Sequence, residues 1–179
     1  LSIAIGQGYN LVTPLQIAVL FGGVANGGIE YRPRILKTIQ TVGGQIVKTR
    51  QPEIIGKLPV SKKTLDLIRN GLKEVVNDRH GTAHWYVYDK KIDISGKTGT
   101  AQVVSLKTEK EMENKKKSVS YDSHAWFVGY APTEKPEIVV SVLVEHGKHG
   151  SSGAGPIAKE MIVSYLNNMV DNSTIMSKK

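Results

Sequence analysis

The most informative stretch of this sequence is Ser95-Gly96-Lys97-Thr98-Gly99-Thr100-Ala101-Gln102. Apolar and β-branched residues flank it at 91–94 and 103–104 without helical periodicity, so we predict a strand. Side chains alternate along a strand, so Thr98 and Thr100 project to one side, and Lys97 and Gly99 to the other. Two hydroxyl groups and one ammonium group are therefore expected within a few ångströms of one another.

Two glycines, Gly96 and Gly99, interrupt this predicted strand. Glycine packs no side chain and loses more chain entropy than other residues, so it suits positions that another backbone approaches closely. We interpret the glycines as room for a ligand along the strand. An edge strand can pair with an extended peptide, and nearby hydroxyls and a cation can hold a terminal carboxylate. The alternative is a solvated lysine on a strand softened by glycine.

Gly96-Lys97-Thr98 also resembles the end of a phosphate-binding P-loop. That motif requires glycine five residues before Gly96 and a helix directly after the threonine. Position 91 is Lys, and the residues after Thr100 favour a continuing strand. The nucleotide-binding interpretation is therefore weak.

Composition is that of an ordinary globular domain of 179 residues, with 40% hydrophobic and 22% charged residues. The formal net charge of +8 favours anionic partners such as a membrane surface, nucleic acid or acidic polymers, and does not choose among them. No nucleic-acid-binding motif is present, and no nucleic-acid partner is predicted. The absence of cysteine excludes disulfides and thiolate sites.

No signal peptide and no apolar run of about 18 residues is present. Because the chain opens on Leu1 without methionine, we expect a fragment whose upstream part, including any anchor, is missing.

The first half of the chain predicts two capped helices with a hairpin between them. Thr13-Pro14-Leu15-Gln16 combines an N-cap, an N-terminal proline and a capping box. The helix should end at Asn26-Gly27-Gly28 and pack through the face formed by Leu15, Ala18, Val19, Gly22 and Ala25. Strands at 34–42 and 45–49 meet at Gly43-Gly44, and 56–59 is a link. Ser61 caps a second helix that ends near Asn77-Asp78, with apolar residues at Leu65, Ile68, Leu72, Val75 and Val76.

The second half predicts two strands and a last helix. Strands at 124–131 and 137–145 are joined by a hairpin loop at 132–136. The second strand is apolar nearly throughout, so both its faces should be covered, and a segment absent from this chain should pair its outer edge. Residues 147–155 are expected to form a flexible loop. Pro156 should begin a helix with one apolar face, formed by Ile157, Met161, Tyr165 and Met169.

Three further segments complete the prediction. The charged stretch 105–121 is expected to be a solvated loop and a candidate rim of the site. His80 and His84 have a metal-binding spacing only if helical, and Gly81 between them favours a loop without a third ligand, so no metal site is predicted. Residues 1–170 should form part of one domain and 171–179 a frayed polar tail. The fold class is α+β, with an antiparallel β-sheet flanked by helices.

The central stretch resembles the third motif of the penicillin-binding transpeptidases and serine β-lactamases, whose three motifs are S-x-x-K, S-x-N and K-T-G. Further segments occur in the order seen in class B penicillin-binding proteins, and the stretch from Gly81 to Gln102 is most similar to the elongation transpeptidases. These segments are Gly6-Gln7-Gly8-Tyr9, Thr13-Pro14-Leu15-Gln16, Tyr31-Arg32-Pro33, Gly81-Thr82-Ala83-His84, His124-Ala125-Trp126-Phe127-Val128-Gly129-Tyr130-Ala131-Pro132 and Gly153-Ala154-Gly155-Pro156.

The resemblance implies roles for individual residues. Lys97 would be catalytic, aiding proton transfer and attracting the substrate carboxylate, and the Thr100 N–H would be an oxyanion-hole donor. Thr98 and Thr100 would hydrogen-bond the carboxylate of a stem peptide ending in D-Ala-D-Ala, or of a β-lactam. Gly99 and Gln102 would belong to the same substrate-binding strand. The resemblance implies neither a metal ion nor an organic cofactor.

The nucleophile of that family is missing from this chain. No serine has lysine three residues on or asparagine two residues on, and Tyr165-Leu166-Asn167 follows the K-T-G strand in the wrong order. The isolated chain is therefore expected to be inactive. In the family, the first two sheet strands and the helical part with both serines precede this region, so the predicted fold is a partial β-lactamase/transpeptidase-like domain.

The resemblance implies a serine-type peptidoglycan D,D-transpeptidase of cell-wall elongation, held at the inner membrane with its domain on the periplasmic side. Its implied partners are the upstream half of the same protein, a polymerising glycosyltransferase and a rod-shape scaffold protein. Two alternatives stay open. One is a β-lactam sensor or β-lactamase on the same fold, and the other is a non-catalytic cell-wall scaffold module.

Overall fold

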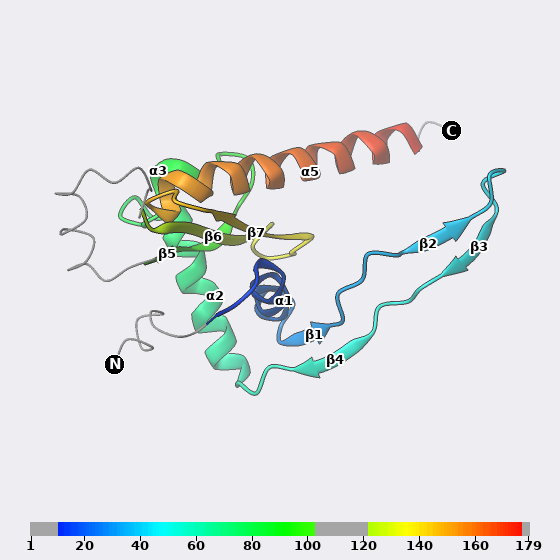
Figure 1. The fold of residues 1–179 in the computed structure, drawn as a ribbon, viewed down its shortest axis with the longest axis horizontal. Coiled ribbons are helices and arrows are strands. Elements are labelled where there is room, and N and C mark those ends of the chain that lie inside the picture. Colours follow the sequence, from blue (N-terminus) through cyan, green and yellow to red (C-terminus); the bar gives the residue numbers. More distant parts are fainter. Residues whose placement is uncertain (1–10, 103–121, 177–179) are drawn as a thin grey trace.

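The computed structural model describes residues 11–102 and 122–176. The predictions for the start of the chain and for the charged stretch 105–121 lie outside these residues. Three strands form the central antiparallel sheet, in the order β5 (Ser95–Ala101), β6 (His124–Ala131) and β7 (Ile138–Val144). Figure 1 shows α5 (Gly155–Met176) and α1 (Pro14–Ala25) on opposite faces of this sheet, with α2 (Lys62–Asn77) beside β5. The predicted α+β class, an antiparallel sheet flanked by helices, is confirmed.

The sheet register places the K-T-G stretch on an outer strand. β6 is central and pairs along its whole length with β5, so that Lys97 lies opposite Val128 and Thr100 opposite Ala125. β7 pairs with the other side of β6. The predicted strand at 124–131 is confirmed residue for residue, and β7 is one residue shorter at each end than predicted. Among the described residues, β5 and β7 each keep one unpaired edge.

Two apolar clusters hold the layers together. The larger one joins the sheet to α5 and to the short helix α3 (His84–Val87), and its fully buried members include Val87, Ile94, Phe127 and Ile162. The smaller one joins the other side of the sheet to α1 and α2 through Val24, Ala25, Leu72 and Tyr130. The central strand is therefore packed on both faces, which keeps β5 rigid where the candidate site lies.

Both predicted helix starts are confirmed. The Thr13 hydroxyl accepts a hydrogen bond from Gln16 N at 3.2 Å, and Gln16 Oε1 accepts one from Thr13 N at 2.8 Å, which completes the capping box. Ser61 Oγ accepts from Thr64 N at 3.1 Å and caps α2. The predicted packing face of α1 is wrong in part, because Leu15 is 58% exposed. Gly23, and not Gly22, is the closely packed glycine, since a Cβ there would lie 3.3 Å from Leu58 Cδ1.

The segment before the last helix differs from the prediction. A π-helical turn (Gly150–Ala154) replaces the expected flexible loop and leads into α5. Gly150 lies so close to β5 and β6 that a side chain there would overlap the carbonyl oxygens of Gly99 and Trp126. The small residues Gly150, Ala154 and Ala158 recur at four-residue intervals and face the sheet. Ile162 continues this row, and Ala154, Ala158 and Ile162 are fully buried.

The predicted buried face of the last helix is wrong. Ile157, Met161 and Tyr165 are 46%, 50% and 39% exposed, because the row containing Ala158 and Ile162, about 100° away around the helix, faces the sheet instead. The Met169 side chain lies outside the described part. The helix backbone runs to Met176, so residues 171–176 are helical where a frayed tail was predicted.

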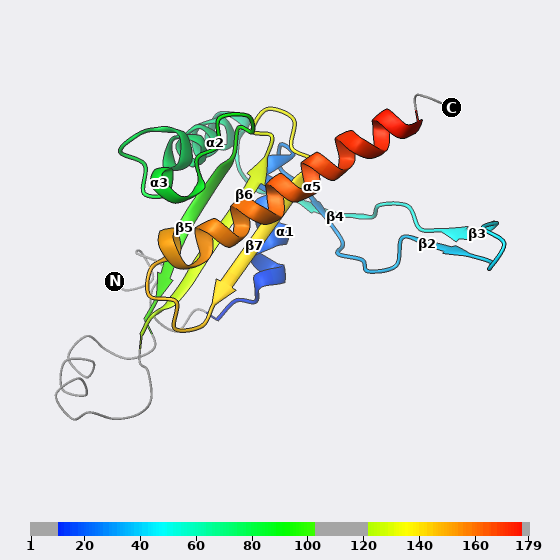
Figure 2. The same ribbon diagram turned by 90° about the horizontal axis from the view of Figure 1, so that it is seen from above.

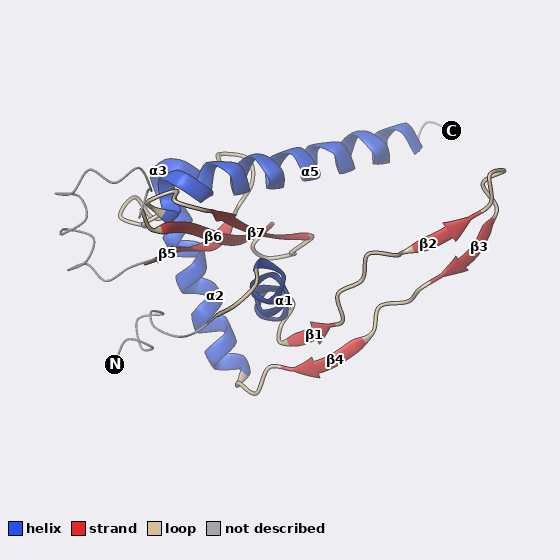
Figure 3. Cartoon of the chain, in the orientation of Figure 1, coloured by secondary structure: helices blue, strands red, loops and turns tan. Residues whose placement is uncertain are grey.

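A long arm leaves the body between α1 and α2, as Figures 2 and 3 show. At its base β1 (Ile29–Tyr31) pairs with β4 (Ile54–Lys57), and at its outer end β2 (Thr38–Gln40) pairs with β3 (Ile46–Thr49). The hairpin at Gly43-Gly44 is confirmed, with strands shorter than predicted. β4 was missed, because Gly56 made its segment resemble a link.

Asp89 anchors the loop that leads into β5. Its Oδ1 accepts hydrogen bonds from Lys91 N at 2.8 Å and Ile92 N at 3.2 Å, and its Oδ2 lies 3.5 Å from Lys159 Nζ. These backbone hydrogen bonds, followed by the Lys159 charge, lower the pKa of Asp89. The ionised carboxylate therefore stabilises the fold above the ordinary pKa of about 4, and this stabilisation is lost as the pH falls through the lower folded pKa.

We expect the Asp89→Asn variant to lower the free energy of unfolding by about 1 kcal/mol at pH 7. The difference from the parent protein should shrink as the pH falls through the lowered folded pKa, because the carboxyl group then becomes neutral in both states. Urea unfolding at pH 7 and through the acidic range measures both effects. Asp66→Asn, on the exposed face of α2, is the matched control and should change little. A destabilisation of the Asp89 variant that does not depend on pH would contradict this account.

Candidate active site

The K-T-G strand presents its functional groups at the edge of the sheet. β5 pairs only with β6 among the described residues, which confirms that it is an edge strand there. Lys97 and Thr100 are exposed, and Thr98 and Gly99 are half-buried. These groups are therefore reachable from solvent while their backbone is fixed by seven paired positions along β6.

An open cavity of about 260 Å³ lies beside this strand. Lys97, Thr98, Gly99 and Thr100 all line it, so the structure brings four of the predicted site residues together. Ile17 and Phe21 of α1 and Trp126 of β6 form the apolar part of its wall. Gln102, the remaining predicted site residue, is exposed and does not line the cavity.

The Lys97 ammonium group is available to an anionic ligand. Its Nζ donates a hydrogen bond to Thr98 O at 2.8 Å. In the part of the chain that the structure describes, no carboxylate lies within ion-pair distance of it. An ammonium group that has no carboxylate partner among the described residues and lines the same cavity as Thr98 and Thr100 can attract and orient a carboxylate.

Thr82 is a site residue that the sequence reasoning missed. Its hydroxyl lies 3.2 Å from the Thr98 hydroxyl, within hydrogen-bond distance. The loop that holds Thr82 packs on the end of α2, where Ala83 N donates to Val75 O at 3.0 Å. The approach is so close that a side chain at Gly81 would overlap the carbonyl oxygens of Glu74 and Val75. Thr82 can therefore orient the Thr98 hydroxyl. The only sequence signal was its place in Gly81-Thr82-Ala83-His84.

The two histidines near this loop have separate structural partners. His84 Nδ1 lies 3.0 Å from Val76 O, and its ring stacks on Tyr88. His80 is exposed and lies 3.2 Å from Asp78 Oδ1. The expected loop is correct up to Ala83, but His84 begins α3. Across residues 11–102 and 122–176, no group of three or more metal-ligating side chains is found.

The glycines of β5 have a packing reason that differs from the interpretation above. A Cβ at Gly96 would lie 2.5 Å from Phe127 Cζ and 2.6 Å from Val128 O. At Gly99 the closest atom to an added Cβ would be Trp126 Cβ, at 3.1 Å. The backbone that approaches Gly96 closely is that of β6 in this same chain.

An antiparallel sheet with helices on both faces, and with Lys-Thr-Gly on an edge strand beside an open cavity, defines the class of the penicillin-binding transpeptidases and serine β-lactamases. The family model described as the penicillin-binding protein transpeptidase domain matches residues 1–163. The chain belongs to this family, and the resemblance seen in its motifs is confirmed.

Curated relatives of the chain include a peptidoglycan D,D-transpeptidase and a penicillin-binding protein. The chain is 34% identical over 168 residues to the peptidoglycan D,D-transpeptidase MrdA of Haemophilus influenzae, covering 93% of this chain and 26% of the relative. It is 35% identical to penicillin-binding protein H of Bacillus subtilis, covering 92% of this chain and 23% of the relative. The chain thus spans about a quarter of the length of these curated relatives.

Solved structures similar to this chain are also penicillin-binding proteins. The chain is similar to penicillin-binding protein 2 of Helicobacter pylori in its complex with MreC, with 32% identity and a TM-score of 0.66 over 93% of this chain and 27% of that one. It is also similar to penicillin-binding protein 2 of Pseudomonas aeruginosa, with 33% identity and a TM-score of 0.68 over 92% and 32% of the two chains. Within the described residues, no helix has the length and apolar character to span a membrane.

Proposed function

We propose that this chain is the K-T-G half of the transpeptidase domain of a serine-type peptidoglycan D,D-transpeptidase active in cell-wall elongation. The observation that carries the proposal is the cavity beside β5, where Lys97, Thr98 and Thr100 gather around one open space. The named relatives support the substrate class, because MrdA is a peptidoglycan D,D-transpeptidase.

The residues of β5 take distinct roles in this proposal. Thr98 and Thr100 hydrogen-bond the terminal carboxylate of a stem peptide ending in D-Ala-D-Ala, and the Lys97 ammonium group attracts it. A serine oxygen attacks the penultimate D-alanyl carbonyl, the peptide bond breaks, and terminal D-alanine leaves with a proton. An amine of a second stem peptide then attacks the acyl-enzyme ester, which forms the cross-link and releases the serine. The Thr100 N–H donates to the oxyanion in both steps.

The serine comes from upstream polypeptide in this proposal. Two surfaces of the described residues support an upstream partner segment: the outer edge of β7, which no described strand pairs, and the exposed row of Ile157, Met161 and Tyr165 on α5. An added strand would satisfy that edge, and apolar residues packed on α5 would bury that row. The same upstream polypeptide would bring the nucleophile to the cavity beside Lys97.

Localisation and partners follow the same proposal. We place the whole protein at the inner membrane, with this domain on the periplasmic side and the anchor outside this chain. Substrates are stem peptides, and β-lactams are their mimics. A polymerising glycosyltransferase and a rod-shape scaffold protein are the proposed assembly partners, and the complex of the Helicobacter pylori relative with MreC supports the scaffold.

The test of this function is cross-linking by the full-length protein. Incubated with a D-Ala-D-Ala donor peptide and an amine acceptor, it should form the cross-linked product and release D-alanine. Rapid, repeated hydrolysis of a β-lactam without cross-linking would favour a β-lactamase, and a stable β-lactam adduct without cross-linking would favour a sensor. Failure to react with either compound would favour a non-catalytic scaffold. Any of these three results contradicts the proposal.

The contact between Thr82 and Thr98 predicts a smaller effect on the same reaction. Thr82→Val removes the hydroxyl that lies 3.2 Å from Thr98, so the second-order rate of acylation by a β-lactam should fall about fivefold, as expected for one lost hydrogen bond. Thr82→Ser keeps the hydroxyl and should restore the rate. Equal rates for the two variants would show that Thr82 does not orient Thr98.

A further inference from the structure

The arm, which we define as residues 31–55, is a surface that the transpeptidase function does not use. Every residue in it is exposed except Thr38, which is half-buried. Within residues 11–102 and 122–176 its outer ladder has two strands and no covering helix, and a ladder of this kind is marginally stable in water. Figures 1 and 3 show it projecting well away from the sheet and the helices. The arm would therefore gain stability if a partner covered its exposed strands.

Large apolar side chains run along the arm. Ile35 and Val42 are fully exposed, and Ile46, Val47 and Ile54 are each more than 60% exposed. These residues are spread from the base of the arm to its tip, so apolar side chains are exposed along its whole length. A partner that lies along the arm can bury them.

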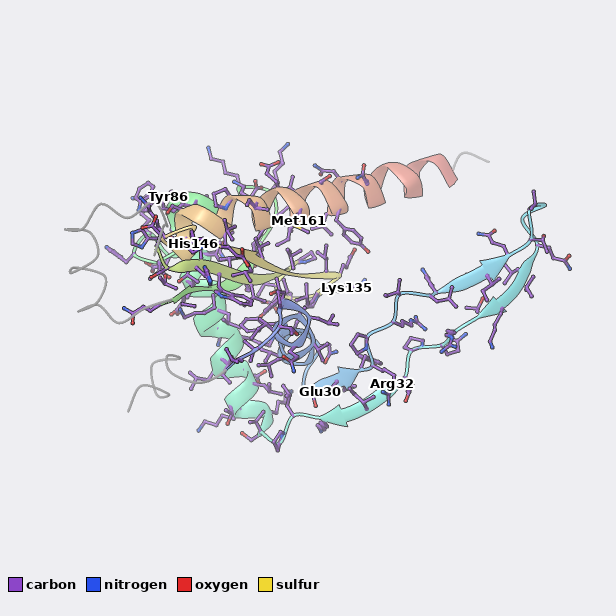
Figure 4. All side chains as sticks on the ribbon, viewed as in Figure 1. Glu30, Arg32, Tyr86, Lys135, His146 and Met161 are labelled. Carbon is purple, nitrogen blue, oxygen red and sulfur yellow. The ribbon has the colours of Figure 1, made fainter. Side chains whose placement is uncertain are left out.

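Charge identifies the kind of partner. The arm contains five basic residues and one acidic residue, so its net charge of +4 is half of the charge of the whole chain. Three of the cations, Arg32, Arg34 and Arg50, line an open cavity of about 250 Å³ where the ladder is interrupted. Figure 4 labels Arg32 near the base of the arm. This distribution complements a partner that is acidic and apolar along its length.

The arginine cavity has more positive charge than its own carboxylate can neutralise. Arg32 Nε lies 2.8 Å from Glu53 Oε2 and is paired. Arg34 donates a hydrogen bond to the backbone oxygen of Arg50, and no described carboxylate forms an ion pair with either residue. A guanidinium group presents several donors in a planar fork that matches a carboxylate. The cavity can therefore receive acidic side chains from outside.

Among the described residues, the ladder also has open edges. Arg50 N donates to Lys37 O at 3.0 Å, so the N–H of Arg50 points into the ladder. The alternation of an antiparallel pair turns the N–H of the neighbouring Thr49 outward. An extended peptide can pair with such an edge. A bilayer cannot, since its hydrocarbon region leaves backbone N–H and C=O groups unsatisfied. The open edges therefore favour a protein segment over an anionic membrane.

We propose that the arm is a docking element for an extended, acidic and apolar segment of a partner protein. The segment adds as a strand along β3, places its carboxylates on Arg34 and Arg50, and covers the exposed apolar residues. This proposal is independent of acylation, because no residue of the arm lines the cavity beside Lys97.

The test uses the full-length protein and a short fluorescent peptide of alternating valine and glutamate, with binding followed by anisotropy at low salt. The peptide should bind, and a matched peptide of valine and lysine should not. Arg34→Glu combined with Arg50→Glu should weaken binding about tenfold or more. Lys90→Glu combined with Lys91→Glu changes the net charge equally at exposed positions outside the arm and should preserve the affinity.

A second variant tests strand addition separately. Thr49→Pro removes one outward N–H without removing a charge and should weaken binding about threefold. Thermal unfolding and penicillin labelling of each variant confirm that the domain is folded. The proposal is overturned if the full-length protein does not bind the peptide, or if both double variants bind it equally. Binding of phosphatidylglycerol vesicles through Arg34 and Arg50, without binding of the peptide, would assign the arm to a membrane instead.

Discussion

Lys97→Ala in the full-length protein is expected to lower the rate of covalent labelling by a fluorescent penicillin by about 100-fold or more. The ammonium group is exposed, lines the cavity beside Thr98 and Thr100, and has no carboxylate partner among the described residues. Removing it takes away both the cation that attracts the substrate carboxylate and the group that aids proton transfer. The measurement is the second-order rate of labelling, read from gel fluorescence over time.

The matched control is Lys91→Ala. Lys91 is also exposed and lies four residues before the start of β5, but its side chain does not line the cavity beside Lys97. This variant should label at a rate within about twofold of the parent protein, because it removes the same charge outside the site. Equal losses in the two variants would indicate a general effect of charge, and an unchanged rate in Lys97→Ala would remove Lys97 from the catalytic machinery.

Gly150→Ala is expected to have the largest effect on stability. An added Cβ would overlap the carbonyl oxygens of Gly99 and Trp126 and would lie 2.8 Å from Gly99 N. These are backbone atoms of two paired strands, so the clash cannot be relieved by a side-chain rotation. Overpacking of this kind should cost about 3 kcal/mol. The midpoint of thermal unfolding should fall by about 6 °C or more. Penicillin labelling should fall as well, since Gly99 lies between Thr98 and Thr100.

Gly71→Ala is the matched control for this substitution. Gly71 lies inside α2, and a Cβ there would meet no atom within 4 Å apart from the neighbouring backbone of its own helix. Alanine is the better helix former, so this variant should gain up to about 1 kcal/mol. If Gly150→Ala unfolds at the same temperature as the parent protein, the close contact between the π-helical turn and β5 is absent from the protein in solution.

Sequence reasoning predicted the elements whose signals are local. The strands around Lys97 and at 124–131 follow from β-branched and apolar residues, and the helix starts at Thr13 and Ser61 follow from side chains that cap their own backbone. The candidate site was predictable for the same reason. Lys97, Thr98, Gly99 and Thr100 are consecutive on one strand, so a correct strand is sufficient to gather them at one cavity.

Features decided by packing between distant segments were not predictable in this way. Periodicity alone supports either of two apolar rows on α5 as the buried face. The row with Ala158 is the one that packs on the sheet, because its small residues let the helix approach closely. The contact of Thr82 with Thr98 depends on how Gly81 packs against the end of α2. The packing around the glycines of β5 is of the same kind, because nothing local to the strand shows the Phe127 ring beside Gly96 or the Trp126 side chain beside Gly99.

In the proposed mechanism, the strand around Lys97 binds the substrate carboxylate while the attacking serine comes from upstream polypeptide. The most direct test of this mechanism is to label the full-length protein with penicillin, digest it, and identify the modified residue by mass spectrometry. The account predicts a single penicilloyl ester on a serine upstream of Leu1, in a sequence with lysine three residues on, and no adduct on any serine from Ser2 to Ser177. An adduct on a serine of this chain, or labelling of residues 1–179 alone, would contradict it.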